Sequence, residues 1–297
     1  MSIQGAHGFR LNAVGRPLEE VELPPLEPGP DEVIVKVAAC GVCHTDVGFA
    51  YDGVPTRHAL PLVLGHEVAG YVVGAGDNVQ MRMSQAVIVP AVIACGKCPA
   101  CRAGRPTICR KQFMPGNDGD GGFATHLRVP AHGLCPVPDQ LPAGVRLESL
   151  SVVADAVTTP FEAIRRSNLQ PGDVAVVVGA GGIGGFGVQI AAAMGAKVVA
   201  IDIDPERLEL AQQFGAELVI NSDRTDEKQL KTAVRNFTAE FARPGSTLKI
   251  FEMSGSAAGQ TLAFNLLDFG AYLAVVGFTA KKVEVRLSNL MAFDATA

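Results

Sequence analysis

The sequence predicts an α/β protein with a β-rich lobe in residues 1–152 and a doubly wound parallel sheet in residues 153–297. Short valine-rich runs separated by glycine and proline fill the first half. In the second half, strand and helix patterns alternate, and a glycine-rich turn follows the first strand of that series. A chain of 297 residues, 48% of them hydrophobic, has enough apolar side chains for two separate cores.

The strands of the amino-terminal lobe are predicted from β-branched runs that turn-forming residues bound. These runs lie at Val33–Val37, Val68–Val73 and Ala86–Val89. In the second lobe, strands are predicted at Val174–Val178, Lys197–Ile201, Glu217–Ile220, Leu248–Glu252 and Ala271–Val276. Helices are predicted at Ile183–Met194 and Pro205–Phe214, where proline suits the first turn. Helical connections between successive strands make the sheet parallel, with helices on both faces.

Composition excludes several classes of protein. A net charge of −5 and a pI near 5.7 disfavour a nucleic-acid surface, which is basic. The chain has no uninterrupted apolar run that spans a bilayer, and its first residues lack the apolar core of a signal peptide. Its seven cysteines are odd in number and mostly clustered, unlike a secreted disulfide framework. We therefore expect a cytoplasmic protein that binds neither membranes nor nucleic acid.

Four cysteines lie in the stretch CGKCPACRAGRPTIC with the spacing C-x2-C-x2-C-x7-C: Cys95, Cys98, Cys101 and Cys109. Four thiolates at ~2.3 Å satisfy a tetrahedral Zn²⁺ and leave no position open for a substrate. The glycines and prolines between them favour a loop that wraps around an ion. An iron–sulfur cluster normally uses a different spacing, and disulfides are the remaining alternative. The pattern thus predicts a structural zinc site.

The glycine-rich turn indicates a dinucleotide site. It comprises Gly179, Gly181, Gly182 and Gly184, directly after the predicted strand and at the start of a helix. Such glycines allow a tight turn, close approach of the backbone to a pyrophosphate and close packing of helix on strand. Asp202 ends the next strand, where a carboxylate accepts hydrogen bonds from the adenosine ribose and favours NAD over NADP. The alternative is that Asp202 only caps the following helix.

A second group of potential metal ligands occurs earlier in the chain. Cys43, His66 and Glu67 supply a thiolate, an imidazole and a carboxylate, and three protein ligands leave zinc one open position. Separation along the sequence does not show that these residues meet, and a lone cysteine or histidine is more often a core residue than a metal ligand. Cys40 and Cys43 also have the spacing of a redox pair.

The motifs CGVCHTD, GHEVAG, the four-cysteine stretch and GAGGIG occur in the order found in zinc-dependent medium-chain alcohol dehydrogenases. The chain resembles this family over essentially its whole length. The resemblance implies a GroES-like catalytic lobe followed by a Rossmann domain, with NAD and two zinc ions per chain, one catalytic and one structural. It also implies a small-molecule alcohol or hydroxyacyl-CoA substrate, and we expect a homo-oligomer.

The resemblance implies roles for individual residues at the catalytic zinc. Cys43 and His66 match its ligands, and Glu67 matches a carboxylate that binds zinc or exchanges with substrate. Asp155 matches a position where members place a further Cys, Asp or Glu ligand. Asp46 matches a residue that orients the histidine ligand.

Other positions match residues that handle the proton and the cofactor. Thr45 matches the hydroxyl that passes the alcohol proton outward, Thr159 a residue beside the nicotinamide, and His44 is expected at the cofactor. Relatives often carry a relay histidine where this chain has Gly48, so the proton exit is expected to use His44, His58 or water. Relatives also continue beyond the position of Ala297 and return to the catalytic lobe, which predicts a fragment or a shortened homologue.

Within the family, two segments narrow the predicted substrate. Met114–His126 and Val129–Pro138 resemble 6-hydroxycyclohex-1-ene-1-carbonyl-CoA dehydrogenase, an enzyme of anaerobic aromatic degradation. The glycines in the first segment are equally explained as a strand turn common to the family. The sequence is also compatible with two other functions. One is a zinc dehydrogenase that acts on a polyol, simple alcohol or amino alcohol, and the other is a truncated, non-catalytic nucleotide-binding zinc protein. A zinc-ribbon nucleic-acid binder conflicts with the acidic charge balance.

Overall fold

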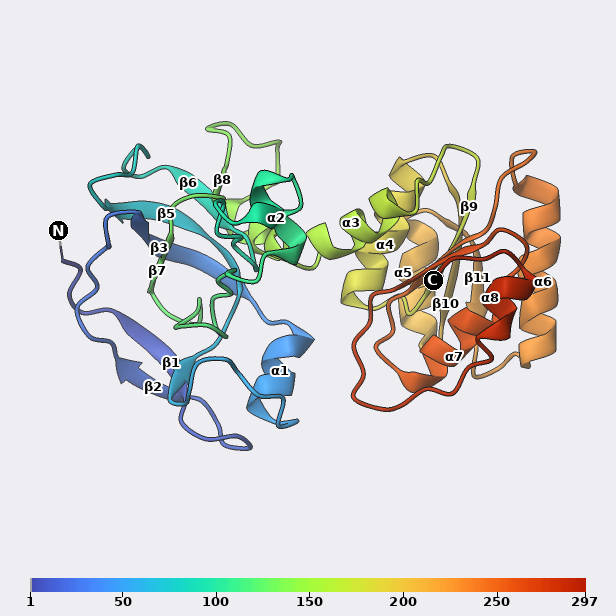
Figure 1. The fold of residues 1–297 in the computed structure, drawn as a ribbon, viewed down its shortest axis with the longest axis horizontal. Coiled ribbons are helices and arrows are strands. Elements are labelled where there is room, and N and C mark those ends of the chain that lie inside the picture. Colours follow the sequence, from blue (N-terminus) through green and yellow to red (C-terminus); the bar gives the residue numbers. More distant parts are fainter. Residues whose placement is uncertain (1) are drawn as a thin grey trace. The chain divides into compact units, whose positions relative to one another are not determined.

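Two antiparallel sheets form the first unit of the chain, which ends at Asp155, and one parallel sheet forms the second, which begins at Ala156 (Figure 1). The structure is a computed structural model and describes residues 2–297. Each unit has hydrophobic clusters of its own. Among the described residues, no helix combines the length and the apolarity that crossing a membrane requires.

The larger sheet of the first unit has the strand order β7-β3-β5-β6-β8, and the smaller one has the order β2-β1-β4. Alternate residues of β3 and β5, such as Val33, Val35, Val68 and Val72, meet in one core. The strands are β1 (His7–Leu11), β2 (Glu19–Glu22), β3 (Glu32–Gly41), β4 (Leu62–Val63), β5 (Glu67–Ala75), β6 (Ala86–Val89), β7 (His126–Pro130) and β8 (Cys135–Pro136). The helices are α1 (His44–Ala50), α2 (Pro99–Arg102) and the 3₁₀ helices η1 (Pro106–Ile108) and η2 (Leu147–Ala154).

The second unit is a five-stranded sheet with the order β11-β10-β9-β12-β13, in which all neighbours are parallel. Its strands are β9 (Val174–Val178), β10 (Lys197–Asp202), β11 (Ala216–Asn221), β12 (Lys249–Glu252) and β13 (Tyr272–Val275). Its helices are α3 (Thr158–Arg166), α4 (Gly182–Ala193), α5 (Pro205–Gln213), α6 (Glu227–Phe241), α7 (Ala257–Asn265) and α8 (Ser288–Ala292). The order reverses between β9 and β12, which is where doubly wound sheets bind ligands.

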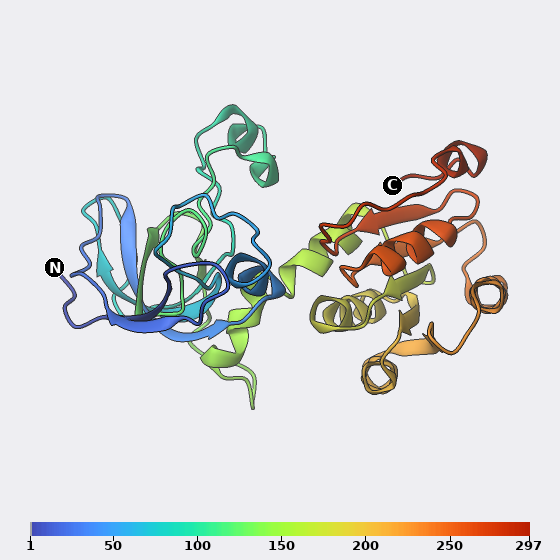
Figure 2. The same ribbon diagram turned by 90° about the horizontal axis from the view of Figure 1, so that it is seen from below.

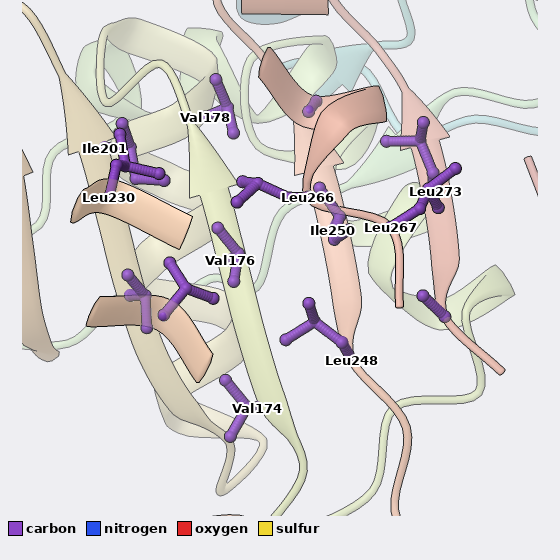
Figure 3. Close-up of a cluster of buried hydrophobic side chains, with 14 of the residues drawn as sticks. Val174, Val176, Val178, Ile201, Leu230, Leu248, Ile250, Leu266, Leu267 and Leu273 are labelled. Carbon is purple, nitrogen blue, oxygen red and sulfur yellow. The ribbon is translucent and has the colours of Figure 1, made fainter. Parts of the chain in front are cut away.

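Both faces of the parallel sheet are covered by helices (Figure 2). Val174, Val176 and Val178 of β9 point to a cluster that α6 and α7 complete (Figure 3). Ala175 and Val177, the alternate residues, point to a second cluster that α3, α4 and α5 complete. A strand buried on both faces has no polar positions, so the run of five aliphatic residues at β9 follows from its central place.

The predicted fold class is confirmed, and the ends of most predicted strands match or shift by one or two residues, whereas β3 continues to Gly41 rather than ending at Val37. β5 runs from Glu67 to Ala75, and helix α4 starts at Gly182 rather than at Ile183. Strand ends are set by hydrogen bonds to neighbouring strands, which lie far away in the sequence. For the same reason β1, β2 and β7 were absent from the predicted strands, since their pairing partners decide them.

Candidate functional site

Three side chains from separate parts of the first unit converge at one point. Cys43 precedes α1, His66 precedes β5, and Asp155 follows η2, which packs against β3 and β5. Asp155 Oδ2 lies 3.7 Å from Cys43 Sγ and 3.4 Å from His66 Nε2, and the three ligand atoms lie within 4.8 Å of one another. Ligand atoms around one tetrahedral zinc are separated by about 3.3–3.8 Å, given bonds of about 2.0–2.3 Å. The donor set and its spacing therefore fit a single zinc ion.

Asp46 holds two of these ligands in place from within α1. Its carboxylate is buried, accepts a hydrogen bond from the Cys43 backbone N–H at 3.0 Å and another from the Gly65 N–H at 3.1 Å. The same side chain lies 3.2 Å from His66 Nδ1. A carboxylate behind a ligating histidine fixes the ring orientation and its tautomer. One side chain thus links the turns that carry Cys43 and His66.

His66 is almost fully buried between two carboxylates. Burial opposes the positive charge, but hydrogen bonding to Asp155, Asp46 and Cys43 outweighs it and raises the pKa of His66 to about 12. The ring therefore lies in negatively charged surroundings, with a carboxylate facing each of its two nitrogens. This site attracts a cation, which is the electrostatic environment that a divalent metal requires.

Glu67 and Cys40 lie beside this cluster but do not join it. Glu67 is buried and is absent from the side chains that converge with Cys43, His66 and Asp155 in the described chain. A Cβ built at Gly41 would overlap Glu67 Oε2, so this glycine makes room for the carboxylate. Burial raises the pKa of the Cys40 thiol to about 12, and both Cys40 and Cys43 are free thiols. The structure thus places Glu67 near the ligands rather than among them.

The residues predicted to carry the proton are exposed on or near α1. Thr45 Oγ1 lies 3.7 Å from Cys43 Sγ, and His44 is exposed beside it. The ring of His58 is exposed, with Nδ1 2.7 Å from the Ala59 carbonyl oxygen. Gly48 is buried, and an added Cβ would lie 3.4 Å from Val54 Cγ2. Val54 therefore contacts the position at which relatives often carry a histidine.

The four predicted cysteine ligands form the second cluster. Cys98 Sγ lies 3.4 Å from Cys101 Sγ and 3.8 Å from Cys109 Sγ, and all four sulfur atoms lie within 4.8 Å of one another. Cys98 precedes α2, whose first residue is Pro99, so a short helix presents two of the thiols. The Lys97 backbone N–H lowers the pKa of Cys95 to about 6, whereas burial and the neighbouring thiols raise the pKa of Cys101 to about 12.

The glycine-rich turn of the second unit has the geometry that close helix–strand packing demands. Gly179 has a φ of +92°, and a Cβ at Gly184 would overlap the Gly179 carbonyl oxygen. Gly181 precedes α4, and a Cβ at Gly182 would meet no atom within 4 Å. The helix therefore begins with open space around Gly182, and a helix N-terminus with room beside it suits a pyrophosphate.

Asp202 braces this turn from the end of β10. One carboxylate oxygen accepts a hydrogen bond from the Ala180 N–H at 2.6 Å, and the other accepts one from the Asp204 N–H at 2.9 Å. Helix α5 is capped by Asp204, whose side chain accepts from the Glu206 N–H at 2.9 Å. Capping of α5 is therefore not the role of Asp202, which stays in contact with the fingerprint turn.

Comparisons with known proteins identify relatives of both units of the chain. Residues 29–139 match the family model of the alcohol dehydrogenase GroES-like domain, and residues 182–297 match that of the zinc-binding dehydrogenases. L-galactonate-5-dehydrogenase of Escherichia coli K12 is 33% identical, over 88% of this chain and 73% of its own length. The chain belongs to the zinc-dependent medium-chain alcohol dehydrogenase family.

Other members of the family show how far the likeness extends. An alcohol dehydrogenase of Geobacillus stearothermophilus is 38% identical over 71% of this chain, which spans 62% of that relative's length. A zinc-binding dehydrogenase from Sinorhizobium meliloti 1021, solved with NADP bound, is 27% identical with a TM-score of 0.81. The match covers 98% of this chain and 82% of that one.

One side chain beside the glycine-rich turn was not predicted from the sequence. Arg207 Nη1 lies 3.5 Å from a Cβ built at Gly181, so a cation sits beside the turn where phosphates are expected. Its signal in the sequence is its place in the first turn of the helix that follows Asp202. Thr159, the expected nicotinamide neighbour, lies in the first turn of α3.

Proposed function

We propose that this chain is an NAD-dependent zinc dehydrogenase that oxidises a secondary alcohol to a ketone. The observation that carries the proposal is the convergence of Cys43 Sγ, His66 Nε2 and Asp155 Oδ2 within 4.8 Å. Three protein ligands are the number that leaves zinc one open position. Four cysteine ligands elsewhere in the unit give the second, structural zinc its own site.

Each group of residues has a defined task in this reaction. When bound, Zn²⁺ supplies Lewis-acid polarisation of an alcohol oxygen and NAD⁺ supplies the acceptor for a hydride. Thr45 Oγ1 would take the hydroxyl proton of the substrate while giving up its own proton to water, His44 or His58. Asp46 keeps His66 in its ligating orientation. The glycine turn and Asp202 hold the dinucleotide, with the carboxylate favouring NAD over NADP.

Among secondary alcohols, the specific substrate that we propose is 6-hydroxycyclohex-1-ene-1-carbonyl-CoA. It is supported by the resemblance of Met114–His126 and Val129–Pro138. The first segment also has a packing role, because a Cβ at Gly121 would overlap the Gly65 carbonyl oxygen just before His66. Its glycines are therefore explained without a CoA ester, and a polyol acid of the kind named by the Escherichia coli relative is the main competing substrate.

The test is NADH formation by the full chain with a panel of alcohols: the cyclic hydroxy-enoyl-CoA, sugar acids, polyols and ethanol. Zinc content is measured in parallel. We expect two zinc ions per chain, and Cys43→Ala should remove one of them and abolish turnover. Cys135→Ser is the matched control, because Cys135 is exposed and outside both clusters.

Two results would contradict parts of the proposal. A Cys43→Ala protein that keeps both zinc ions would remove the catalytic zinc assignment. A chain that binds zinc and NADH but oxidises none of the panel would favour the non-catalytic alternative. If a polyol or ethanol outperforms the CoA ester, the narrow substrate fails and the zinc dehydrogenase proposal stands.

A further inference from the structure

Glu252, the last residue of β12, carries a carboxylate with only one of its two oxygens satisfied. The residue is fully buried. Oε1 accepts hydrogen bonds from the Ser254 N–H at 2.8 Å and from Ser254 Oγ at 2.5 Å. Oε2 has no hydrogen-bond partner among residues 2–297. A buried carboxylate oxygen without a donor destabilises a fold, so this arrangement calls for a reason other than stability.

The position of Glu252 supplies such a reason. β12 lies next to β9, where the strand order of the sheet reverses. The backbone carbonyl of Glu252 accepts from the N–H groups of Val276 at 2.8 Å and Gly277 at 3.0 Å, just beyond β13. Backbone and side chain of one residue therefore join the loop after β12 to the turn after β13. Both lie at the carboxyl ends of the strands, the ligand-binding side of such a sheet.

The same loop is packed tightly against the glycine-rich turn. A Cβ at Gly179 would lie 2.5 Å from the Cα and N atoms of Ser254. A Cβ at Gly277 would lie 2.9 Å from Glu252 Oε2 and would overlap the Gly255 nitrogen. The glycine-rich turn after β9, the loop after β12 and the turn after β13 are therefore in close van der Waals contact.

Hydrogen bonds continue from Glu252 to the start of α7. Ser254 Oγ lies 2.9 Å from Ser256 Oγ, and Ser256 caps α7 by accepting from the Gly259 N–H at 2.9 Å. A shift of the Glu252 carboxylate would therefore move the whole segment 253–256. These hydrogen bonds fix where the segment lies, but none of their residues is expected to contact a reacting atom of the substrate or the cofactor.

We propose that Glu252 is a positioning residue for the nicotinamide half of the dinucleotide, an inference that rests on the proposed function. The glycine turn after β9 and Asp202 after β10 are the expected contacts of the pyrophosphate and the adenosine ribose. The second nucleoside must then cross the reversal point and lie over the ends of β12 and β13. Glu252 fixes the two segments that form that surface.

The experiment compares NADH with ADP-ribose, which lacks the nicotinamide, as ligands of the full chain. Glu252→Gln keeps the shape of the side chain but removes its charge and weakens the short bond to Ser254. We expect the dissociation constant of NADH to rise roughly tenfold and that of ADP-ribose to change less than about twofold. The emission of bound NADH should shift towards that of the free nucleotide, because its ring is no longer held.

Asp173→Asn is the matched control. Asp173 is also buried, accepts from Arg243 Nη2 at 2.8 Å, and precedes β9 at the opposite end of the sheet. Its loss should lower the thermal stability while NADH and ADP-ribose binding change in step. Gly277→Ala is a second test variant, because its added Cβ pushes against Glu252 Oε2 and Gly255. This variant should weaken the binding of NADH more than that of ADP-ribose, and it tests the proposal even if Glu252→Gln fails to fold.

The outcomes separate this inference from the proposed function. If the unmodified chain binds neither ligand, the dinucleotide function fails and the inference fails with it. If the unmodified chain binds both, and Glu252→Gln weakens both equally or neither, Glu252 has no positioning role and the proposed function remains.

Discussion

His66 lies between the carboxylates of Asp46 and Asp155, and this arrangement shapes the candidate zinc site at the scale of single residues. One carboxylate faces Nδ1 and orients the ring, whereas the other faces Nε2 and converges with the Cys43 thiol. The two acids thus have different tasks although they belong to one cluster. Asp46 approaches Nδ1 and is expected to orient the histidine, whereas Asp155 approaches Nε2 and is expected to serve as a ligand.

The first residue-scale prediction concerns the proton path. Thr45→Ala should lower kcat by ~10²-fold or more, because a positioned hydroxyl is lost from the transfer of the substrate proton. Thr45→Ser is the control and should retain most of the rate. Steady-state kinetics with the best alcohol of the panel checks both. A silent Thr45→Ala together with a damaging His44 or His58 substitution would move the proton path to that histidine.

The second residue-scale prediction concerns the choice of cofactor. Asp202→Asn should reduce the preference for NAD⁺ over NADP⁺ in kcat/KM on the order of tenfold, because the repulsion of a 2′-phosphate is lost. The amide oxygen of Asn keeps the bond from the Ala180 N–H to the glycine turn, while the bond from the Asp204 N–H is lost. Asp204→Asn, two residues on, should leave the preference unchanged. Equal use of both cofactors by the unmodified chain would show that Asp202 does not face the ribose.

At the scale of elements, one glycine-rich segment positions the candidate zinc site by close backbone contact. Segment 114–123 runs against the strand that leads to His66, with the Gly121 N–H donating to the Val63 carbonyl and the Phe123 N–H to the Leu64 carbonyl. A Cβ at Gly116 would lie 2.8 Å from the Gly65 nitrogen. Segment 114–123 can approach the backbone before His66 this closely only because its glycines have no side chains. The position of His66 before β5 therefore depends on these glycines.

The element-scale prediction uses two adjacent glycines of α4. Gly184→Ala should destabilise the second unit by about 1–3 kcal/mol and weaken dinucleotide binding, because its Cβ overlaps the Gly179 carbonyl. At Gly185 a Cβ would lie 3.7 Å from the Ala180 oxygen, an ordinary contact. Gly185→Ala should then stabilise the helix by about 0.5–1 kcal/mol. Denaturant unfolding of both variants checks the opposite signs, and equal effects would contradict the packing argument.

At the scale of the whole molecule, the candidate metal ligands all belong to the first unit and the glycine-rich turn belongs to the second. Chelation of zinc should expose amides around Cys95–Cys109 to hydrogen exchange, because structural zinc contributes on the order of 10 kcal/mol to such sites. ADP-ribose should protect amides of residues 179–184. Exchange measured by mass spectrometry checks both changes. Unchanged exchange at the cysteine loop after chelation would contradict the structural zinc site.

The sequence by itself determined the alternation of β9, α4, β10 and α5, the glycine turn and the four-cysteine loop. Each is a local pattern, because ligands or turn residues that lie within about fifteen positions meet through short turns. The family resemblance pointed to Asp155 as a further ligand, and the tertiary structure brings it to Cys43 and His66. The tertiary structure alone decided that Glu67 stays outside the trio and that Val54 contacts Gly48. It alone showed Asp202 bonded to the glycine turn and Glu252 buried with a free oxygen. Side-chain convergence across a fold is set by packing, which no spacing in the chain encodes.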